Sequence, residues 1–300
     1  MTNAQSLQAT IHHVEDLQVV VKTMKALAAV SIRQYERAVE VLGEYSRSIE
    51  TGFQILLQQQ SSEGELLIPS GVQSRPLSFR RVAIIIFGSD RGLCGQFNER
   101  ITSFALSKLQ ALALDHEPLI AIAGERLLPS LESANHQIDQ QFAVPIAVDG
   151  IVDLTTEILL AIEQWQVHEG IDRVILFYNE PSTSATDQPR QFQLLPLDSD
   201  WLRSLSQRSW QTNQIPLLTM NDEEFLSALM REYLFLYLFR AAAASLASEN
   251  ASRLYSMQSA EKNIQDRISD LTSEYRRQRQ SAITSELLDV VSGFEALSDP

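Results

Sequence analysis

The fold follows from one stretch of sequence, VEDLQVVVKTMKALAAVSIRQYERAVEVLGEYSRSIETGFQIL (Val14–Leu56). Steps of three and four residues land on Val14, Leu17, Val21, Met24, Ala28, Ser31, Tyr35, Ala38, Leu42, Tyr45, Ile49, Gly52 and Leu56, and only Ser31 and Gly52 break the apolar pattern. Six heptads exceed an ordinary globular helix and predict a coiled coil. Small residues such as Ala28, Ser31 and Ala38 let a partner helix come close, which favours pairing within the chain.

The C-terminal part of the sequence supplies the partner helix. Asn221 in TMNDEEFLSALM suits an N-cap, and the acidic residues after it complement the helix dipole. No proline follows as far as Leu297, so a helix of roughly 75 residues is allowed. Heptad spacing holds at Leu254, Met257, Ile264, Ile268, Leu271 and Tyr275, with Glu261 as a polar interruption, and resumes one residue out of phase at Ile283, Leu287, Val290, Phe294 and Leu297.

The two predicted helices differ in length. The first spans Leu7 to Leu57, so an antiparallel pair leaves part of the second helix without its partner. Because that part keeps apolar positions, we expect another protein to cover it.

Between the helices the pattern changes to alternating strands and helices. RRVAIIIFG, PLIAIAG, DRVILFYNE and QFQLLPL are typical of strands, with helices in FNERITSFALSKLQALAL and DLTTEILLAIEQWQ and a short helical turn in GERLLPSLES. This order predicts a mostly parallel, Rossmann-like α/β domain whose last two strands form a hairpin. The expected organisation is an N-terminal coiled-coil helix (1–60), a linker (61–78), the α/β domain (79–200), a connection (201–220) and a C-terminal coiled-coil helix (221–300).

Composition narrows the classes of partner. The formal net charge of −14 makes nucleic acid an unexpected partner, because affinity for nucleic acid comes from basic residues that neutralise phosphates.

One cysteine, Cys94, cannot form an internal disulfide. The N-terminus lacks the pattern of a secretory signal, and the longest apolar run, from Tyr233, contains Arg240 and is too short to span a bilayer.

The turn GSDRGLCG (Gly88–Gly95) is the candidate ligand site, since it follows a strand and precedes a helix. It matches neither the dinucleotide fingerprint nor the P-loop, and Asp90 would repel phosphate. We expect a tight structural turn, although a nucleotide-binding α/β enzyme with helical arms stays an alternative.

Adjacent His12 and His13 do not share a helical face, so no metal site is predicted. No cofactor is predicted either. A self-associating coiled-coil adaptor is the third hypothesis.

Three segments together resemble the gamma subunit of F-type rotary ATP synthases. They are SDRGLCGQFN, IHHVEDLQVVVKTMKALAAVSIR and SENASRLYSMQSAEKNIQDRISDLTSEYRRQRQSAITSELLDVVSG. In the first helix the matching positions are Ile11, Val14, Gln18, Lys22, Met24, Lys25, Ala28, Ala29 and Arg33. The stretch from about Leu106 to Gln214 is similar only in kind.

The resemblance implies a non-catalytic coupling subunit. Its two helices would form a shaft inside a hexamer of alternating alpha and beta subunits, and its α/β domain would lie against the epsilon subunit and the membrane c-ring. The complex would lie on the cytoplasmic side of a bacterial-type energy-transducing membrane, with this subunit peripheral to it.

The resemblance also assigns residues to the hexamer contact. These are Lys22, Met24 and Lys25 on the first helix, Arg279, Gln280, Thr284 and Glu286 on the second, and an apolar tip with Val290, Phe294 and Leu297 for the hydrophobic collar. On composition alone, the neighbouring basic run of Arg276, Arg277 and Arg279 is typical of a solvated helix face. Glu15, Asp16, Leu17, Val19 and Val21 make the first helix more acidic and apolar than is usual for the family, which raises the hypothesis of an alternate complex that pumps sodium ions. The paired cysteines of redox-regulated chloroplast gamma subunits are absent from the sequence.

Overall fold

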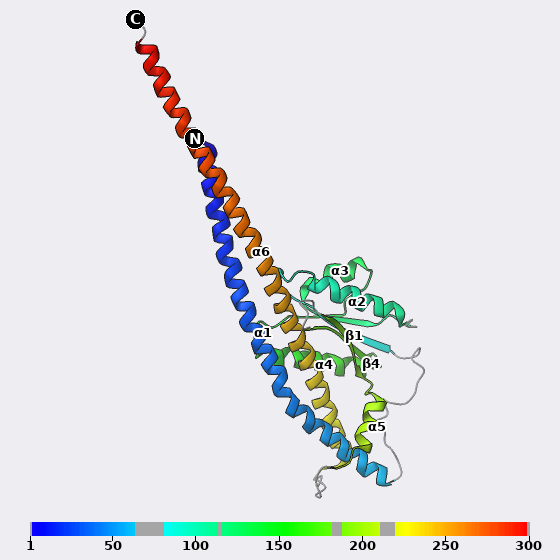
Figure 1. Ribbon diagram of the computed structural model, residues 1–300. Coiled ribbons are helices and arrows are strands. Elements are labelled where there is room, and N and C mark those ends of the chain that lie inside the picture. The colour runs from blue at the N-terminus through cyan, green and yellow to red at the C-terminus, as the bar shows by residue number, and fades with distance from the viewer. Residues whose placement is uncertain (1, 64–80, 113–115, 182–187, 211–219, 299–300) are drawn as a thin grey trace. The chain divides into compact units, whose positions relative to one another are not determined.

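A computed structural model describes residues 2–63, 81–112, 116–181, 188–210 and 220–298 of the protein (Figure 1). Its two long helices are α1 (Thr2–Glu63) and α6 (Asp222–Ser298). The chain divides into a smaller unit, Met1–Ala28 with Arg253–Pro300, and a larger unit, Ala29–Ser252. Each long helix therefore contributes one segment to each unit.

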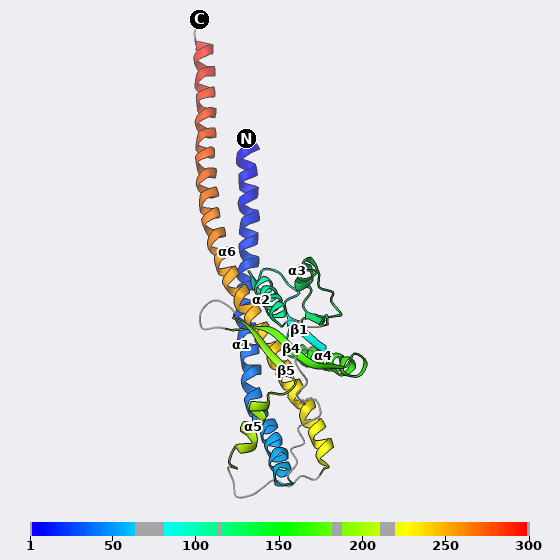
Figure 2. The ribbon, with the colours of Figure 1, turned by 90° about the vertical axis from the view of Figure 1, so that its right-hand side faces the viewer.

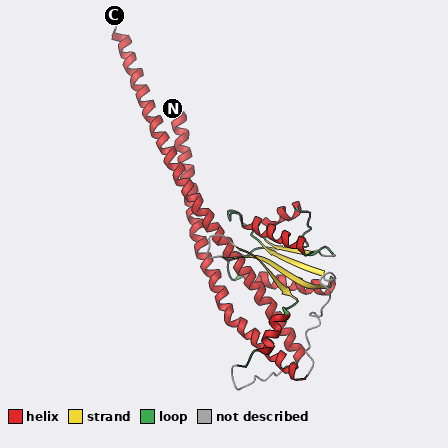
Figure 3. Cartoon of the chain, turned by 45° about the vertical axis from the view of Figure 1, so that its right-hand side comes forward, coloured by secondary structure: helices red, strands yellow, loops and turns green. Residues whose placement is uncertain are grey.

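The larger unit is built on a five-stranded sheet in the order β3-β2-β1-β4-β5. Figure 3 draws the strands of this sheet in yellow. Its strands are β1 (Arg81–Phe87), β2 (Leu119–Ala123), β3 (Gln140–Phe142), β4 (Ile171–Glu180) and β5 (Gln188–Leu195). β1 pairs in parallel with β2 and β4, β2 pairs in parallel with β3, and β5 is antiparallel to β4. The predicted mostly parallel α/β sheet and its final hairpin are confirmed.

The central strand β1 is buried on both faces, which explains its unbroken apolar sequence. On one face Ile84 and Ile86 pack in a cluster with Ile101 of α2 (Phe97–Ala111). The 3-10 helix η3 (Glu125–Leu127) and helix α3 (Leu128–Ser133) supply further members of this cluster. On the opposite face Ala83 and Ile85 belong to the larger cluster.

Four helical segments build that larger cluster. They come from α4 (Gly150–His168), from α5 (Ser199–Gln207), and from the parts of α1 and α6 that lie in this unit (Figure 1). Phe53 of α1 shows how they meet, because its ring makes edge contacts with Trp201 of α5 and Tyr233 of α6 at centroid distances of 5.6 and 6.1 Å. The long helices are thus part of the core of the α/β unit.

One stretch of α6, Ala241–Glu249, is buried at every position. Alanine and serine predominate in it, and such short side chains let neighbouring backbones approach closely. The hydroxyl of Ser245 donates to the carbonyl oxygen of Phe87 at 3.4 Å, at the end of β1. A helix buried all round must be surrounded by packed elements, and here the sheet and α1 are among them.

The smaller unit is an antiparallel helix pair. Gln18 Nε2 donates to Gln265 Oε1 at 3.4 Å, and Lys25 forms an ion pair with Glu261. Residue numbers rise along α1 as they fall along α6 between these two contacts, which sets the direction of pairing. In this part of α6, Met257 and Leu271 are buried and Ile264, Ile268 and Tyr275 are half-buried, as the heptad pattern predicts. The predicted coiled coil is therefore confirmed in this unit.

Two positions of the predicted α1 stripe are wrong. Leu17 is 51% exposed and Tyr45 is 39% exposed, whereas Gln18 and Ser46, one residue later, are half-buried. A helix with 3.6 residues per turn drifts relative to a strict heptad, so a fixed seven-residue ladder loses register. The Tyr45 hydroxyl instead donates to the Glu232 carboxylate, and partial burial together with this bond raises the pKa of Tyr45 to about 12.

Three elements differ from the sequence-based expectation. β3 was not predicted, and α5 begins before the predicted connection 201–220 and occupies its first part. The Asp198 carboxylate caps α5 by accepting from the amide of Asp200 at 2.8 Å. α1 continues to Glu63, three residues into the predicted linker, while residues 64–78 of that linker lie outside the described residues.

Enlarging a side chain in the buried stretch of α6 tests its tight packing. Ala243 is fully buried, so Ala243→Leu is expected to lower the free energy of unfolding by about 1–3 kcal/mol through overpacking. Urea denaturation followed by tryptophan fluorescence measures the change. Ala228→Leu, the same substitution at an exposed position of α6, should stay within about 0.5 kcal/mol of the parent protein. Equal effects at the two positions would contradict close packing at Ala243.

Candidate functional site

The turn after β1 is held together by its own side chains. The Asn98 amide oxygen accepts from the Ser89 backbone amide at 3.0 Å, and Asn98 Nδ2 donates to Ser89 Oγ at 2.8 Å. Cys94 is buried inside the turn, with its sulfur 3.6 Å from Ser89 Oγ. Leu93 and Gly95 adopt positive φ angles of 64° and 60°, which lets the chain reverse between β1 and α2.

Asp90 extends these bonds to two other segments. Its carboxylate oxygens accept from the backbone amides of Glu125 at 2.8 Å and Val144 at 2.7 Å. The carbonyl of Cys94 in turn accepts from the hydroxyl of Ser252 on α6 at 2.7 Å. The turn therefore links β1 to η3, to the segment after β3 and to α6, which makes it a structural junction of the larger unit.

These bonds bear on the nucleotide-binding alternative. A phosphate cradle needs backbone amides that point at the ligand, but the Ser89 amide already donates within the turn. The Asp90 carboxylate adds negative charge there. The geometry accordingly favours the structural interpretation of GSDRGLCG, and the Ser89, Asp90 and Asn98 network is a role that the sequence motif alone did not reveal.

The predicted contact residues of α1 have different environments. Lys22 is exposed and Met24 is half-buried. Lys25 is half-buried and ion-paired with Glu261, and the hydrogen bond from Lys25 lowers the pKa of that carboxyl. The positive charge of Lys25 thus helps to hold the two helices together. The heptad pattern did not identify this contact between the helices.

The four predicted polar contact residues of α6 face solvent. Arg279, Gln280, Thr284 and Glu286 are exposed, and Thr284 Oγ1 donates back to the Gln280 carbonyl at 2.9 Å. Arg279 lies 18 residues beyond Glu261, which is about 27 Å along a helix. Because Lys25 lies opposite Glu261, the structure does not bring the α1 and α6 contact residues together, and they form two separate patches.

Among the described residues, none forms a partner helix for the end of α6. With Gln18 opposite Gln265, the part of α1 that precedes Gln18 reaches only to about Ser281 on α6. Every residue from Ser281 to Ser292 is exposed, and Figure 2 shows this part of α6 continuing past the N-terminal end of α1. The overhang, residues 281–292, carries five large apolar side chains, namely Ile283, Leu287, Leu288, Val290 and Val291.

The predicted apolar tip is described in part. Val290 is 70% exposed. Phe294 and Leu297 belong to α6, but their side chains lie outside the described residues. In the described parts of the chain, no group of three or more His, Cys, Asp or Glu side chains could hold a metal ion. No helix in those parts is long and apolar enough to cross a membrane.

The described structure thus combines an uncovered helix end with a turn whose side chains are hydrogen-bonded within the chain. A family model described as ATP synthase matches residues 3–297. The chain therefore belongs to the ATP synthase family, and its curated relatives are ATP synthase gamma chains.

Relatives from distant bacteria match along the whole chain. The gamma chain of Anaeromyxobacter dehalogenans is 28% identical over 302 residues, covering 99% of this chain and 100% of the relative. That of Sulfurovum sp. is 25% identical over 303 residues with the same coverage. A chain of the Euglena gracilis mitochondrial ATP synthase, solved in the OSCP/F1/c-ring part of the enzyme, has the same fold, with a TM-score of 0.64 and 16% identity over 99% of this chain and 95% of that chain.

Removing the Asp90 carboxylate tests the junction. Asp90→Ala leaves two backbone amides without their charged acceptor, so the free energy of unfolding should fall by about 2–4 kcal/mol. Urea denaturation of the full chain provides the measurement. Glu157→Ala, which removes an exposed carboxylate on α4, should change stability by less than about 0.5 kcal/mol. A loss no larger than in that control would mean that the Asp90 bonds do not support the fold.

Acid titration tests the Lys25–Glu261 pair. Because the pKa of Glu261 is lowered in the folded chain, its stabilising contribution is complete above the ordinary glutamate value of 4.5 and is lost as pH falls through the lowered pKa. Glu261→Gln should therefore reduce the urea midpoint at pH 7, and its difference from the parent protein should vanish in acid. Glu286→Gln, in the exposed overhang, is the control and should leave the urea midpoint at pH 7 unchanged. A difference for Glu261→Gln that is constant with pH would rule out the pair as its cause.

Proposed function

We propose that the helix pair is the shaft through which ion flow at a membrane ring drives conformational change in the catalytic beta subunits of an ATP synthase. As a gamma chain the protein is the central stalk subunit, and catalysis belongs to the beta subunits. The single observation that carries the proposal is the overhang of α6, where apolar side chains are exposed and no other described segment of the chain packs as a partner helix.

The overhang fits a surrounding ring of subunits. Exposed apolar side chains on a helix gain free energy when a partner removes them from water. We assign Val290, Phe294 and Leu297 to an apolar collar, and Arg279, Gln280, Thr284 and Glu286 to a polar contact just below it. Arginine suits such a contact because its guanidinium group makes paired hydrogen bonds to a carboxylate.

The second patch, Lys22, Met24 and Lys25, would touch the ring at a different level. Its distance of about 27 Å from Arg279 along the helix axis supports two contacts instead of one. Lys22 is the exposed cation of this patch, whereas Lys25 also serves Glu261 within the chain. A partner carboxylate is therefore expected to interact chiefly with Lys22.

The shaft is asymmetric because its two helices differ in sequence and length. Exposed Glu15 and Asp16 lie on α1, while exposed Arg276, Arg277 and Arg279 lie on α6. A turning shaft of this kind presents different charges to each beta subunit in succession. Since it binds the conformations of those subunits unequally, rotation shifts their populations, and this coupling needs no bond chemistry in the shaft itself.

The remaining partners are assigned by relationship. We propose that the larger unit binds an epsilon subunit and a membrane c-ring; the similar Euglena chain was solved in an assembly that contains a c-ring. The protein would be peripheral to the membrane, on its cytoplasmic side. The sodium-ion hypothesis stays a prediction, tested by the dependence of transport on sodium in the assembled complex.

Comparing the isolated chain with the assembled complex distinguishes a coupling subunit from an enzyme. The isolated chain should not hydrolyse ATP, measured by phosphate release, but should raise ATP turnover when it is assembled with alpha and beta subunits. Hydrolysis by the purified chain alone would overturn the proposal.

A substitution at Arg279 tests the contact directly. Losing one partner of a buried interfacial charge pair costs about 2–5 kcal/mol, so Arg279→Ala should reduce ATP-driven ion pumping by the assembled complex more than about tenfold. The urea midpoint of the isolated chain should not change, because Arg279 is exposed there. Arg126→Ala, at an exposed arginine of η3, is the control that should keep pumping intact. Normal pumping by Arg279→Ala would remove the assignment.

A further inference from the structure

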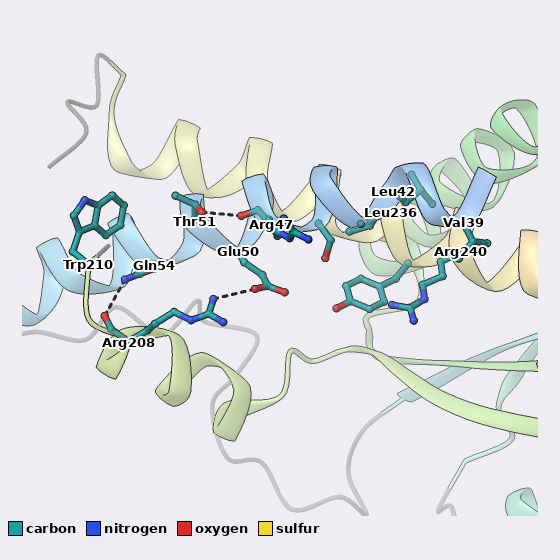
Figure 4. Close-up of a pocket in the computed structure, with 13 residues that line it drawn as sticks. Val39, Leu42, Arg47, Glu50, Thr51, Gln54, Arg208, Trp210, Leu236 and Arg240 are labelled. Carbon is teal, nitrogen blue, oxygen red and sulfur yellow. Dashed lines mark hydrogen bonds and ion pairs between the residues drawn. The ribbon is translucent and has the colours of Figure 1, made fainter. Parts of the chain in front are cut away.

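A cleft of about 900 Å³ lies in the larger unit, between α1, α6 and the segment that follows α5 (Figure 4). Its volume falls in the range of about 300–1,000 Å³ that is typical of small-molecule sites. Arg47 and Glu50 reach it from α1, Arg208 and Trp210 from the segment after α5, and Arg240 from α6. None of these residues belongs to the shaft contacts described above.

One of the three arginines is held in place by α1. Arg208 Nη1 lies 3.2 Å from Glu50 Oε2, and the Arg208 carbonyl accepts from Gln54 Nε2 at 2.9 Å and from Gln58 Nε2 at 2.8 Å. These bonds fix the wall of the cleft at its α5 side. Glu50, the acidic residue among those that line the cleft, also neutralises the positive charge of Arg208.

The other two arginines carry charge without such a partner. No ion pair joins Arg47 or Arg240 to an acidic side chain within the described residues. Two uncompensated guanidinium groups therefore line one concave site on a chain whose formal net charge is −14. Such a local reversal of charge concentrates anions in the cleft.

The walls strengthen this attraction. Trp210 and Tyr237 line the cleft, and Tyr237 stacks on Phe192 at a centroid distance of 4.8 Å, so parts of its wall are aromatic. Aromatic walls displace water, and charge interactions are stronger where water is partly excluded. Guanidinium groups bind phosphate and carboxylate oxygens through paired hydrogen bonds.

We propose that this cleft binds a small multivalent oxyanion, either a phosphate ester or a polycarboxylate, between Arg47 and Arg240. Glu50 sets the strength of binding: it occupies Arg208 and places one negative charge beside the ligand. The site is independent of the shaft function, because its residues belong to the larger unit, whereas both contact patches belong to the smaller unit.

Titration calorimetry on the full chain tests the site. Pyrophosphate and citrate serve as separate probes at constant ionic strength. Arg240→Gln and Arg47→Gln should each weaken binding by about tenfold, the usual effect of losing a charged hydrogen-bonded contact. Glu50→Gln should strengthen binding, because it removes the opposing charge and releases Arg208.

The matched control is Arg37→Gln, an exposed arginine on α1 about 15 Å along the helix from Arg47. It should leave the affinity unchanged. Stronger binding of pyrophosphate than of citrate would assign the site to ligands with phosphate groups, and the reverse order would assign it to polycarboxylates. Equal weakening by Arg37→Gln and Arg240→Gln, or no binding of either probe, overturns the proposal. Two arginine variants are used so that one remains informative if the other has an altered urea midpoint.

Discussion

The close packing of Ala241–Glu249 within the larger unit is the constraint on which the rest of the structure depends. Short side chains bring the α6 backbone near the end of β1, and hydroxyl groups of Ser245 and Ser252 bind carbonyls of Phe87 and of the turn. Larger residues would separate the helix from the sheet. This packing makes a long helix a core element of an α/β unit.

The larger unit uses polar groups to bind its own segments together, whereas the smaller unit exposes charged and apolar side chains. In the larger unit the turn after β1 satisfies its own groups, and Asp90 binds amides from two other segments. In the smaller unit the exposed faces carry charges and apolar side chains that the chain leaves uncovered. Stability is thus concentrated around the sheet, while the surface available for recognition lies along the helices. This division suits a subunit that must keep its own shape while its partners change theirs.

Much of the fold could be predicted from periodicity. The heptads of α6 and the unbroken apolar run of β1 each leave a direct signal, because burial repeats with the geometry of the element. β3 left almost none, since only Phe142 of its three residues is buried. The exposure of Leu17 depends on helix drift, and the Lys25–Glu261 pair depends on the register between two distant segments. Neither can be obtained from spacing within one helix.

The candidate site also has parts that could be predicted from the sequence and parts that could not. Family resemblance singled out Arg279 and its neighbours, and chain lengths alone predicted an overhang. The cleft with Arg47, Arg208 and Arg240 joins three segments far apart in sequence, so no local motif marks it. The internal role of Asp90 was equally hidden, because a carboxylate in a turn looks the same whether it repels a ligand or binds a remote amide.

The uncovered end of α6 has a consequence for how the protein is made. A chain released alone into solution presents Ile283, Leu287 and Val290 to every other protein it meets. Surplus copies are then bound by chaperones, degraded or drawn into aggregates. A cell that produces this chain must therefore match its synthesis to that of the proteins that enclose it.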